Sequence, residues 1–177
     1  MKKKLEKRLA YLYSGELLSI VLFVPVSYLL NDAYPDLHLY ALYSFWASFI
    51  LLEFLLLQGT IYWYVKLGRL RNGKNPATPT RVVQQLRYLR TVDMVLIVTA
   101  MVAFAFDIAK WHPSLPSGGL AIAFFIYIFA ILEFINYFYF QLSYKVSEIK
   151  DLMKNRKLKV SCMNKDFRRI HNWNSEN

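Results

Sequence analysis

The sequence predicts an all-α, polytopic membrane protein built as a bundle of four transmembrane helices. Three observations predict this fold: 56% of the 177 residues are hydrophobic, only 19% are charged, and the apolar residues gather in four blocks. Soluble domains carry about a quarter charged residues. Each block is about as long as a helix that crosses a hydrocarbon core of roughly 30 Å. The predicted spans are residues 13–30, 40–64, 92–109 and 119–142.

The segments outside the spans are short on one side of the predicted bundle and longer on the other. Residues 1–12 precede the first span, residues 65–91 join the second span to the third, and residues 143–177 follow the fourth. Thr78 and Pro79 are typical of a helix start, so one helix is predicted to begin near Pro79 and run into the third span.

The fourth helix is predicted to continue beyond the membrane. Apolar residues recur there at alternating spacings of four and three, which is typical of a helix that packs on a neighbour or on a second copy of the chain. These residues are Leu142, Val146, Ile149 and Met153. From about residue 155 the chain is polar and basic, and we expect it to be poorly ordered.

The basic residues predict the orientation of the bundle. Five precede the first span, seven lie between the second and third spans, nine follow the fourth, and only Lys110 lies elsewhere. The positive-inside rule therefore predicts a multi-pass protein of the cell membrane with both termini and residues 65–91 in the cytoplasm. Topology and contact with anionic lipid head groups explain the net charge of +10, so nucleic acid is not the expected partner.

The second and fourth spans carry the same tripeptide near their centres, Leu52-Glu53-Phe54 and Leu132-Glu133-Phe134. A shift of 80 positions aligns these triplets, and a shift of 77 aligns Glu16 with Asp93. A duplicated helical hairpin would explain both correspondences, with an approximate two-fold axis along the membrane normal, as in some transporters. Convergent composition of membrane helices is the alternative interpretation.

Glu53 and Glu133 are the predicted intramembrane polar site. A carboxylate near the centre of a span costs roughly 2.5–3.5 kcal/mol on insertion scales, so both side chains should face the bundle interior. No Lys, Arg or His lies at that depth, and we therefore expect at least one of the two carboxyl groups to be protonated. Spans two and four should then be in contact. The other polar side chains that could join are Gln58, Asn136, Ser48, Thr99 and Gln141.

Three interpretations of this site remain open. The acids could form an interhelical hydrogen-bonded clasp, bind a proton or cation for transport, or hold a hard metal ion. The metal interpretation is the weakest, because Glu16 and Asp93 lie at a different depth and no Glu-x-x-His pair exists.

Glu16 and Asp93 are secondary acidic positions with ordinary alternative explanations. Glu16 is predicted near a helix N-terminus, where a carboxylate is stabilised. Asp93 is predicted at head-group depth, in reach of water. Asp107, near the outer end of the third span, should reach water or Lys110.

The sequence contains no motif of a known catalytic class, and no cofactor or metal is predicted. A P-loop, a Gly-x-Ser-x-Gly elbow and a His-Glu-x-x-His pair are all missing. The three histidines lie outside the spans, which argues against haem, and Cys162 is the only cysteine.

Two classes of function remain. The first is a non-enzymatic accessory, regulatory or interaction subunit that acts through its basic cytoplasmic face, with a second copy or another membrane protein as its partner. The alternative is a small proton- or cation-coupled transporter that uses Glu53 and Glu133.

Overall fold

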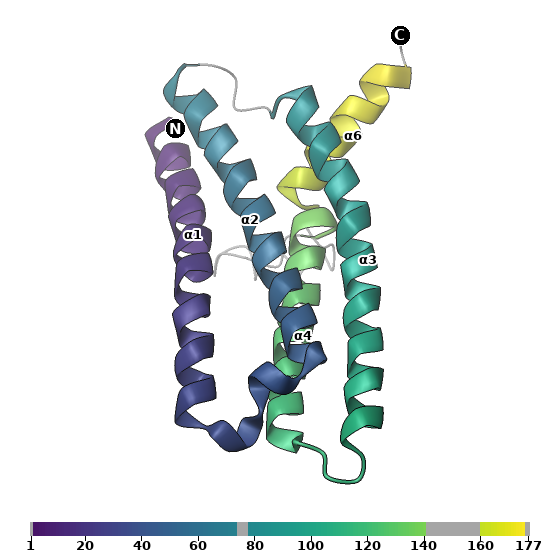
Figure 1. Ribbon diagram of the computed structural model, residues 1–177. Coiled ribbons are helices and arrows are strands. Elements are labelled where there is room, and N and C mark those ends of the chain that lie inside the picture. Colours follow the sequence, from purple (N-terminus) through teal and green to yellow (C-terminus); the bar gives the residue numbers. More distant parts are fainter. Residues whose placement is uncertain (1, 74–77, 141–159, 176–177) are drawn as a thin grey trace, which may run out of the picture.

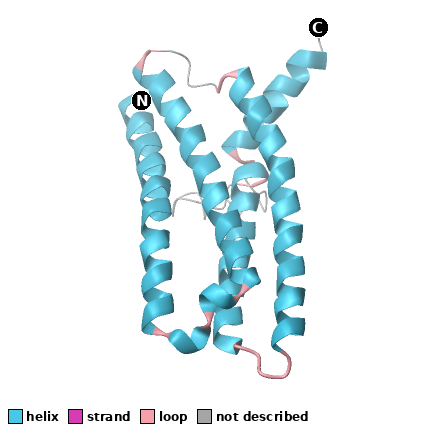
Figure 2. Cartoon of the chain, in the orientation of Figure 1, coloured by secondary structure: helices cyan, strands magenta, loops and turns pink. Residues whose placement is uncertain are grey.

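The computed structural model describes residues 2–73, 78–140 and 160–175, and nearly all of them are helical. Four long helices form an up-and-down bundle, and the shorter helix α6 packs at one end of it (Figure 1). Within the described residues there is no strand, only an isolated bridge between Phe140 and Val160 (Figure 2). The helices are α1 (Lys2–Ala33), α2 (Tyr43–Arg71), α3 (Thr80–Trp111), α4 (Ser117–Phe138) and α6 (Cys162–Ser175), with 3-10 turns η1 (Pro35–Leu37) and η2 (Leu39–Ala41).

All four long helices are long and apolar enough to cross a membrane. Their most apolar windows have mean hydropathies between 1.5 and 2.3. Large apolar side chains cover the outside of the bundle, among them Val21, Leu57, Val98 and Phe125. Such an exterior suits lipid rather than water. The prediction of an all-α bundle of four transmembrane helices is confirmed, and the architecture is that of a multi-pass membrane protein.

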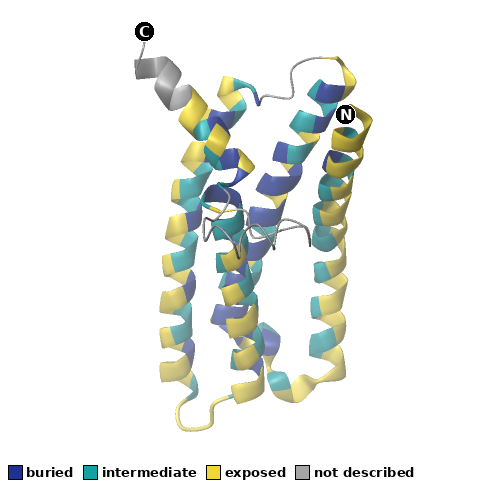
Figure 3. Ribbon diagram, turned by 180° about the vertical axis from the view of Figure 1, so that it is seen from behind, coloured by how far each residue is buried: buried dark blue, intermediate teal, exposed yellow. Residues whose placement is uncertain are grey.

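Helix α2 is the centre of the bundle. It packs along α1, α3 and α4, whereas α3 and α4 have few contacts with each other and α1 contacts the bundle chiefly through α2. The buried residues therefore concentrate on α2, while α1 shows a largely exposed surface (Figure 3). The predicted contact between the second and fourth spans is confirmed.

The two hairpins are not packed alike. Helices α1 and α2 lie in close contact over much of their length, but α3 and α4 touch only sparsely. A symmetrical duplicated hairpin would give both pairs the same packing. The bundle does not have that symmetry, so the duplication remains an interpretation of the sequence alone.

Helix α3 begins where the sequence predicted, but not for the predicted reason. It starts at Thr80 with Pro79 in the capping position, and no side chain caps it. The Thr78 hydroxyl instead donates a hydrogen bond to Asp166 of α6, 2.6 Å away. The threonine that looks like a helix cap is therefore a contact for the C-terminal helix.

The predicted continuation of the fourth helix past the membrane is wrong, because α4 ends at Phe138. Ser161 lies beside the end of α4 and donates hydrogen bonds to two carbonyl groups there. Its hydroxyl donates to the Tyr137 carbonyl at 2.6 Å and its backbone N–H donates to the Tyr139 carbonyl at 3.2 Å. Leu142, Val146, Ile149 and Met153 lie outside the described residues.

Beyond residue 155, the described part of the chain contains helix α6, which packs against the bundle. Met163 is buried in the main hydrophobic cluster, and Phe167 packs on it. The Phe167 ring stacks on that of Phe138, with 6.1 Å between the ring centroids. Helix α6 is thereby fixed to the end of α4.

A carboxylate from α3 accepts hydrogen bonds from the first residues of α2. The first N–H groups of a helix lack partners within the helix, and Leu42 offers no side-chain acceptor. Asp107 supplies both acceptors: its Oδ1 accepts the Tyr43 N–H at 3.2 Å and its Oδ2 accepts the Ser44 N–H at 2.7 Å. Asp107 is fully buried, so the expectation that it reaches water is wrong.

Close packing of the connections at this end of the bundle depends on Gly119. A Cβ at this position would collide with the carbonyl oxygen of Leu37 in η1. The glycine at the start of α4 therefore allows the connection between α1 and α2 to lie directly against it.

Replacing Asp107 with Ala should destabilise the bundle by about 2 kcal/mol, because two buried N–H groups of α2 lose their acceptors. The free energy of unfolding in mixed micelles measures this. Asp36→Ala, which removes an exposed carboxylate from the same end, should cost less than about 0.5 kcal/mol. Equal effects of the two replacements would contradict the capping role.

Candidate functional site

The structure does not bring Glu53 and Glu133 together as a pair. Glu53 lies on the helix face of Ile50 and Leu57, at spacings of three and four, and both of those side chains are exposed. Its Oε1 is buried and has no hydrogen-bond partner among the described residues. Glu133 lies on α4, where Asn136 of the same helix donates a hydrogen bond to its Oε2 at 3.2 Å. Glu53 is half-buried, so the expectation that it faces the bundle interior stays a prediction.

Glu133 is accompanied instead by Glu16 of α1. Both carboxyl groups line a groove of about 230 Å³ between α1 and α4, together with Asn136 and Tyr137. Glu16 lies well inside α1, fourteen residues after its first residue Lys2, so its predicted place near a helix N-terminus is wrong. Its Oε1 accepts a hydrogen bond from the Trp63 indole at 2.8 Å.

Gly59 of α2 forms the floor of this polar region. A Cβ on Gly59 would collide with the Glu16 Oε2, and it would lie 2.5 Å from the Tyr137 hydroxyl oxygen. The absence of a side chain thus lets these two polar atoms approach the α2 backbone. Tyr137 is only 4% exposed, and its hydroxyl donates a hydrogen bond to the Glu16 carboxyl group.

The polar region continues into an apolar one toward the end of the bundle opposite α6. A second cavity of about 280 Å³ lies between α1 and α4 over α2, and it shares Phe23 and Phe129 with the first. We call the two together the α1–α4 groove. Its polar end is lined by Glu16, Glu133, Asn136 and Tyr137, and its apolar end by Phe23, Leu30, Phe49, Leu52, Ile126 and Phe129.

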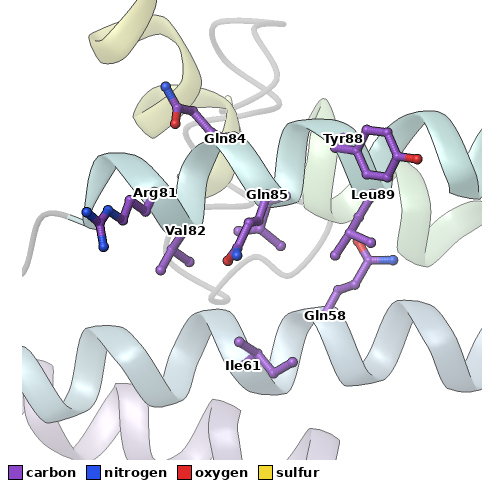
Figure 4. Close-up of a pocket in the computed structure, with 9 residues that line it drawn as sticks. Gln58, Ile61, Arg81, Val82, Gln84, Gln85, Tyr88 and Leu89 are labelled. Carbon is purple, nitrogen blue, oxygen red and sulfur yellow. The ribbon is translucent and has the colours of Figure 1, made fainter.

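Gln58 and Asp93 form a separate buried pair between α2 and α3. The Gln58 Nε2 donates to the Asp93 Oδ1 at 2.7 Å, and Asp93 is 0% exposed. The prediction that Asp93 reaches water is therefore wrong. A groove of about 660 Å³ lies beside this pair, between α2 and α3. Figure 4 shows Gln58 and Ile61 on the wall formed by α2, and Arg81 and Gln85 on the wall formed by the start of α3.

The remaining polar side chains named from the sequence join none of these groups. The Ser48 hydroxyl is buried without a partner among the described residues. Thr99 is exposed and donates to the Val95 carbonyl of its own helix at 2.9 Å. Gln141 lies outside the described residues.

A buried polar cluster holds α6 against the end of α2 and the residues just before α3. Asp166 Oδ2 accepts hydrogen bonds from Tyr62 at 2.9 Å and from Thr78, and it lies 3.0 Å from the Lys66 ammonium. Arg169 donates to the Thr78 carbonyl at 2.6 Å. Burial by itself would raise the pKa of Asp166, but the Thr78 hydrogen bond, the charge of Lys66 and the hydrogen bonds from Lys66 and Tyr62 outweigh it and lower that pKa.

The bundle gathers positive charge at the end where α6 docks. The N-terminus, the connection between α2 and α3, and α6 all lie at this end (Figure 1). Of the described basic residues, only Lys110 lies at the opposite end, in the last turn of α3. The exposed ones at the α6 end are Lys2, Lys3, Lys4, Lys7, Arg8, Arg71, Arg81, Arg87, Lys165, Arg168 and Arg169, which we call the basic face.

Sequence reasoning missed several of these residues. Trp63, Gly59 and Tyr137 complete the polar end of the groove, and Asp166 completes the cluster under α6. One signal was available: Leu52, Leu56, Gly59 and Trp63 recur at spacings of three and four, which places them on one face of α2. No group of three or more His, Cys, Asp and Glu side chains that could hold a metal ion occurs in residues 2–73, 78–140 and 160–175.

Comparison with known proteins finds no protein-family model that matches the chain, and no curated protein or solved structure with significant similarity to it.

The Gln58–Asp93 pair should show strong coupling. Gln58→Leu leaves the buried Asp93 without a donor and should cost about 1–3 kcal/mol, whereas Gln58→Leu with Asp93→Leu removes both polar groups and should recover most of that loss. A double-mutant cycle on unfolding in mixed micelles measures the coupling. Thr99→Val is the control and should change stability by less than about 0.5 kcal/mol. Additive effects of the two leucine replacements would contradict the pairing.

Docking of α6 should depend on pH through Asp166. Because folding lowers the pKa of this carboxyl group, its contribution is complete above its unfolded pKa of about 4 and is lost as the pH falls through the lower folded value. Hydrogen exchange of the α6 amides, corrected for intrinsic rates, should therefore be slow at pH 6 and faster below about pH 3.5. Asp166→Asn should exchange quickly at both pH values, and unchanged protection in that variant would contradict the role of the carboxylate.

Proposed function

We propose that this protein is a non-enzymatic accessory, regulatory or interaction subunit of a membrane assembly, which works through its basic face. The observation that carries the proposal is the attachment of α6 by Asp166 to Tyr62, Lys66 and Thr78. This attachment gives the basic side chains of α2, α3 and α6 a fixed relative position. A preorganised charged surface loses little conformational entropy when it binds.

The proposed orientation places the basic face in the cytoplasm of a cell, with the protein in the cell membrane and both termini inside. The positive-inside rule supports it, because the basic residues lie at one end of the bundle and Lys110 alone at the other among those described. The outer connections are short, so they leave little surface for a partner on that side.

The proposed partners are anionic lipid head groups together with a membrane protein or a second copy of this chain. Basic side chains close to a bilayer surface gain roughly 1 kcal/mol each from anionic lipid. Residues such as Arg81 and Arg87 start α3 near that surface, whereas Lys165 and Arg168 on α6 are free to meet an acidic protein surface. Nucleic acid is not proposed, because the charge follows the membrane topology.

Proton- or cation-coupled transport through Glu53 and Glu133 has less support from the geometry. Glu53 shares a helix face with the exposed Ile50 and Leu57, and Glu133 lines the groove with Glu16, which Glu53 does not line.

The orientation predicts a clear labelling pattern. A cysteine placed at Lys165 in a Cys162→Ser background should react with a membrane-impermeant maleimide only after the inner face is opened, because the basic face is proposed to be cytoplasmic. A cysteine placed at Asp36 should react in intact cells. The reverse pattern would contradict the proposed orientation.

Charge reversal tests the proposed interaction. Lys165→Glu with Arg168→Glu should weaken the affinity for the partner by roughly tenfold or more, which corresponds to about 1.4 kcal/mol. The complex is measured by crosslinking and by purification through either partner. Lys110→Glu, at the opposite end, is the matched control and should leave it intact. Asp166→Asn should also weaken the complex, because it frees α6 without removing a basic side chain.

The same samples test the transport alternative. Proteoliposomes that contain the parent protein should show no proton-coupled flux. There should therefore be no such flux for the double variant Glu53→Gln with Glu133→Gln to abolish. Such a flux, lost in that variant while the complex persists, would overturn the accessory function.

A further inference from the structure

The groove between α2 and α3 opens onto the basic face and is separate from the polar cluster under α6. Its volume is about 660 Å³, and we call it the α2–α3 groove. Gln58 and Ile61 of α2 form one wall, and the first turns of α3 form the other (Figure 4). This volume is within the usual range of ligand-binding sites in proteins.

The groove crosses the edge of the predicted membrane spans. Ile61 lies in the last turn of the second predicted span, whereas Arg81 and Gln85 lie in the segment that joins the second span to the third. Ile61 is half-exposed and apolar, and the Arg81 side chain is exposed at the start of α3. One end of the groove is therefore expected among lipid head groups and the other among acyl chains.

The polar end presents side chains that the chain itself does not use. Arg81 and Gln85 make no ion pair or hydrogen bond within residues 2–73, 78–140 and 160–175. By contrast, Arg90 on the same helix donates to the Tyr139 hydroxyl at 2.6 Å. None of the described residues that line the groove is acidic. A guanidinium in this setting favours an anionic ligand, and its geometry suits two parallel hydrogen bonds to phosphate oxygens.

The start of α3 adds to the preference for an anion. Its first N–H groups have no partner inside the helix, and no side chain caps it. Partial positive charge collects at such a helix start. Asp166, which accepts a hydrogen bond from Thr78 just before α3, has its charge balanced by the Lys66 ammonium 3.0 Å away. The helix start therefore reinforces the positive charge of Arg81.

The chemistry of the groove changes in one direction along α3. Arg81, Gln85 and Leu89 follow one another at intervals of four residues, roughly 6 Å per step along the helix, and Figure 4 shows them in that order. A guanidinium, a carboxamide and an alkyl group thus succeed one another from the head-group end into the membrane. In a diacyl phospholipid, a phosphate, ester carbonyl groups and acyl chains succeed one another in the same direction.

The deep end of the groove offers apolar surface. Ile61 of α2 and Val82, Leu86 and Leu89 of α3 line it. Gln58 also lies there, but its Nε2 is engaged within the protein, where it donates to the Asp93 Oδ1 at 2.7 Å. The alkyl side chains therefore provide the surface along which an acyl chain packs.

We propose that the α2–α3 groove binds one anionic diacyl phospholipid from the leaflet at the basic face. Its phosphate lies between the Arg81 guanidinium and the start of α3, an ester carbonyl accepts a hydrogen bond from the Gln85 carboxamide, and an acyl chain runs past Ile61 and Leu89. The anionic class follows from the surrounding charge, because exposed basic residues such as Arg87 belong to the same face. The site rests on the proposed contact of the basic face with anionic lipid, but not on a protein partner.

The test uses the purified full-length protein in a neutral glycoside detergent, with a phosphatidylglycerol that carries a photoreactive diazirine on one acyl chain. Adducts should fall on the peptides around Ile61 and Leu89. Unlabelled phosphatidylglycerol should compete roughly tenfold better than diacylglycerol with the same chains, which lacks the phosphate, and about threefold better than phosphatidylcholine. Inorganic phosphate should not compete. Equal competition by diacylglycerol or by phosphatidylcholine, or displacement by inorganic phosphate, would overturn the proposal.

Variants locate the two ends of the lipid. Arg81→Gln should weaken competition by roughly tenfold or more, whereas Arg87→Gln, on the same helix but outside the groove, should change it by less than about twofold. Ile61→Trp fills the groove and should abolish labelling around Leu89. Its control is Leu57→Trp, one turn away and outside the groove, since Ile61 is 47% exposed and Leu57 is 46% exposed. If the two members of either pair behave alike, the groove is not the site.

The lipid site and the proposed protein interaction fail separately. Lys165→Glu with Arg168→Glu lies outside the groove and should leave its labelling unchanged, even where the partner complex is lost. Even labelling of all exposed apolar positions, Val98 and Phe125 included, would show that lipid contacts the bundle without a site. That result would end the lipid proposal and leave the interaction to be judged by crosslinking alone.

Discussion

The bilayer offers no hydrogen bonds, and the rest of the structure follows from how this chain satisfies its polar groups without water. Several of these contacts involve α2. Asp107 of α3 accepts its first N–H groups, and Asp93 of α3 accepts from its Gln58. Further along the same helix, Trp63 donates to Glu16 of α1 and Tyr62 donates to Asp166 of α6. Helix α2 thus makes the polar contacts that orient α1, α3 and α6, which are all of its neighbouring helices except α4 among those described.

The spans themselves could be predicted because length and hydropathy are properties of a continuous segment. The rotation of each helix could not. In a soluble helix, polar residues mark the outward face, but lipid and core both select apolar side chains, so the usual periodicity is weak. Glu53 and Glu133 lie at similar predicted depths, yet only Glu133 faces the groove. The sequence predicts the depth of each acid in the membrane, but it does not predict the direction in which each acid points around its helix axis.

Long-range contacts were the other limit. Thr78 has the sequence of a helix cap, but its hydroxyl bonds Asp166, 88 residues later. Glu16 lies near the start of the first predicted span, whereas α1 begins at Lys2 and continues through the basic segment, so Glu16 is far from the helix end. In both cases local rules described the residue correctly in isolation, and a distant partner decided its role.

The central position of α2 has a consequence for how the protein is made. Membrane helices insert first and associate afterwards, and during synthesis α1 and α2 enter the bilayer before α3 and α4. Until α3 arrives, Gln58 has neither Asp93 nor water, and the start of α2 has no acceptor from Asp107. The hairpin of α1 and α2 has therefore formed its apolar contacts, while polar groups of α2 still lack their partners on α3. Arrival of the third helix ends this state, and it provides a chemical reason for α3 to associate with α2 rather than with α1.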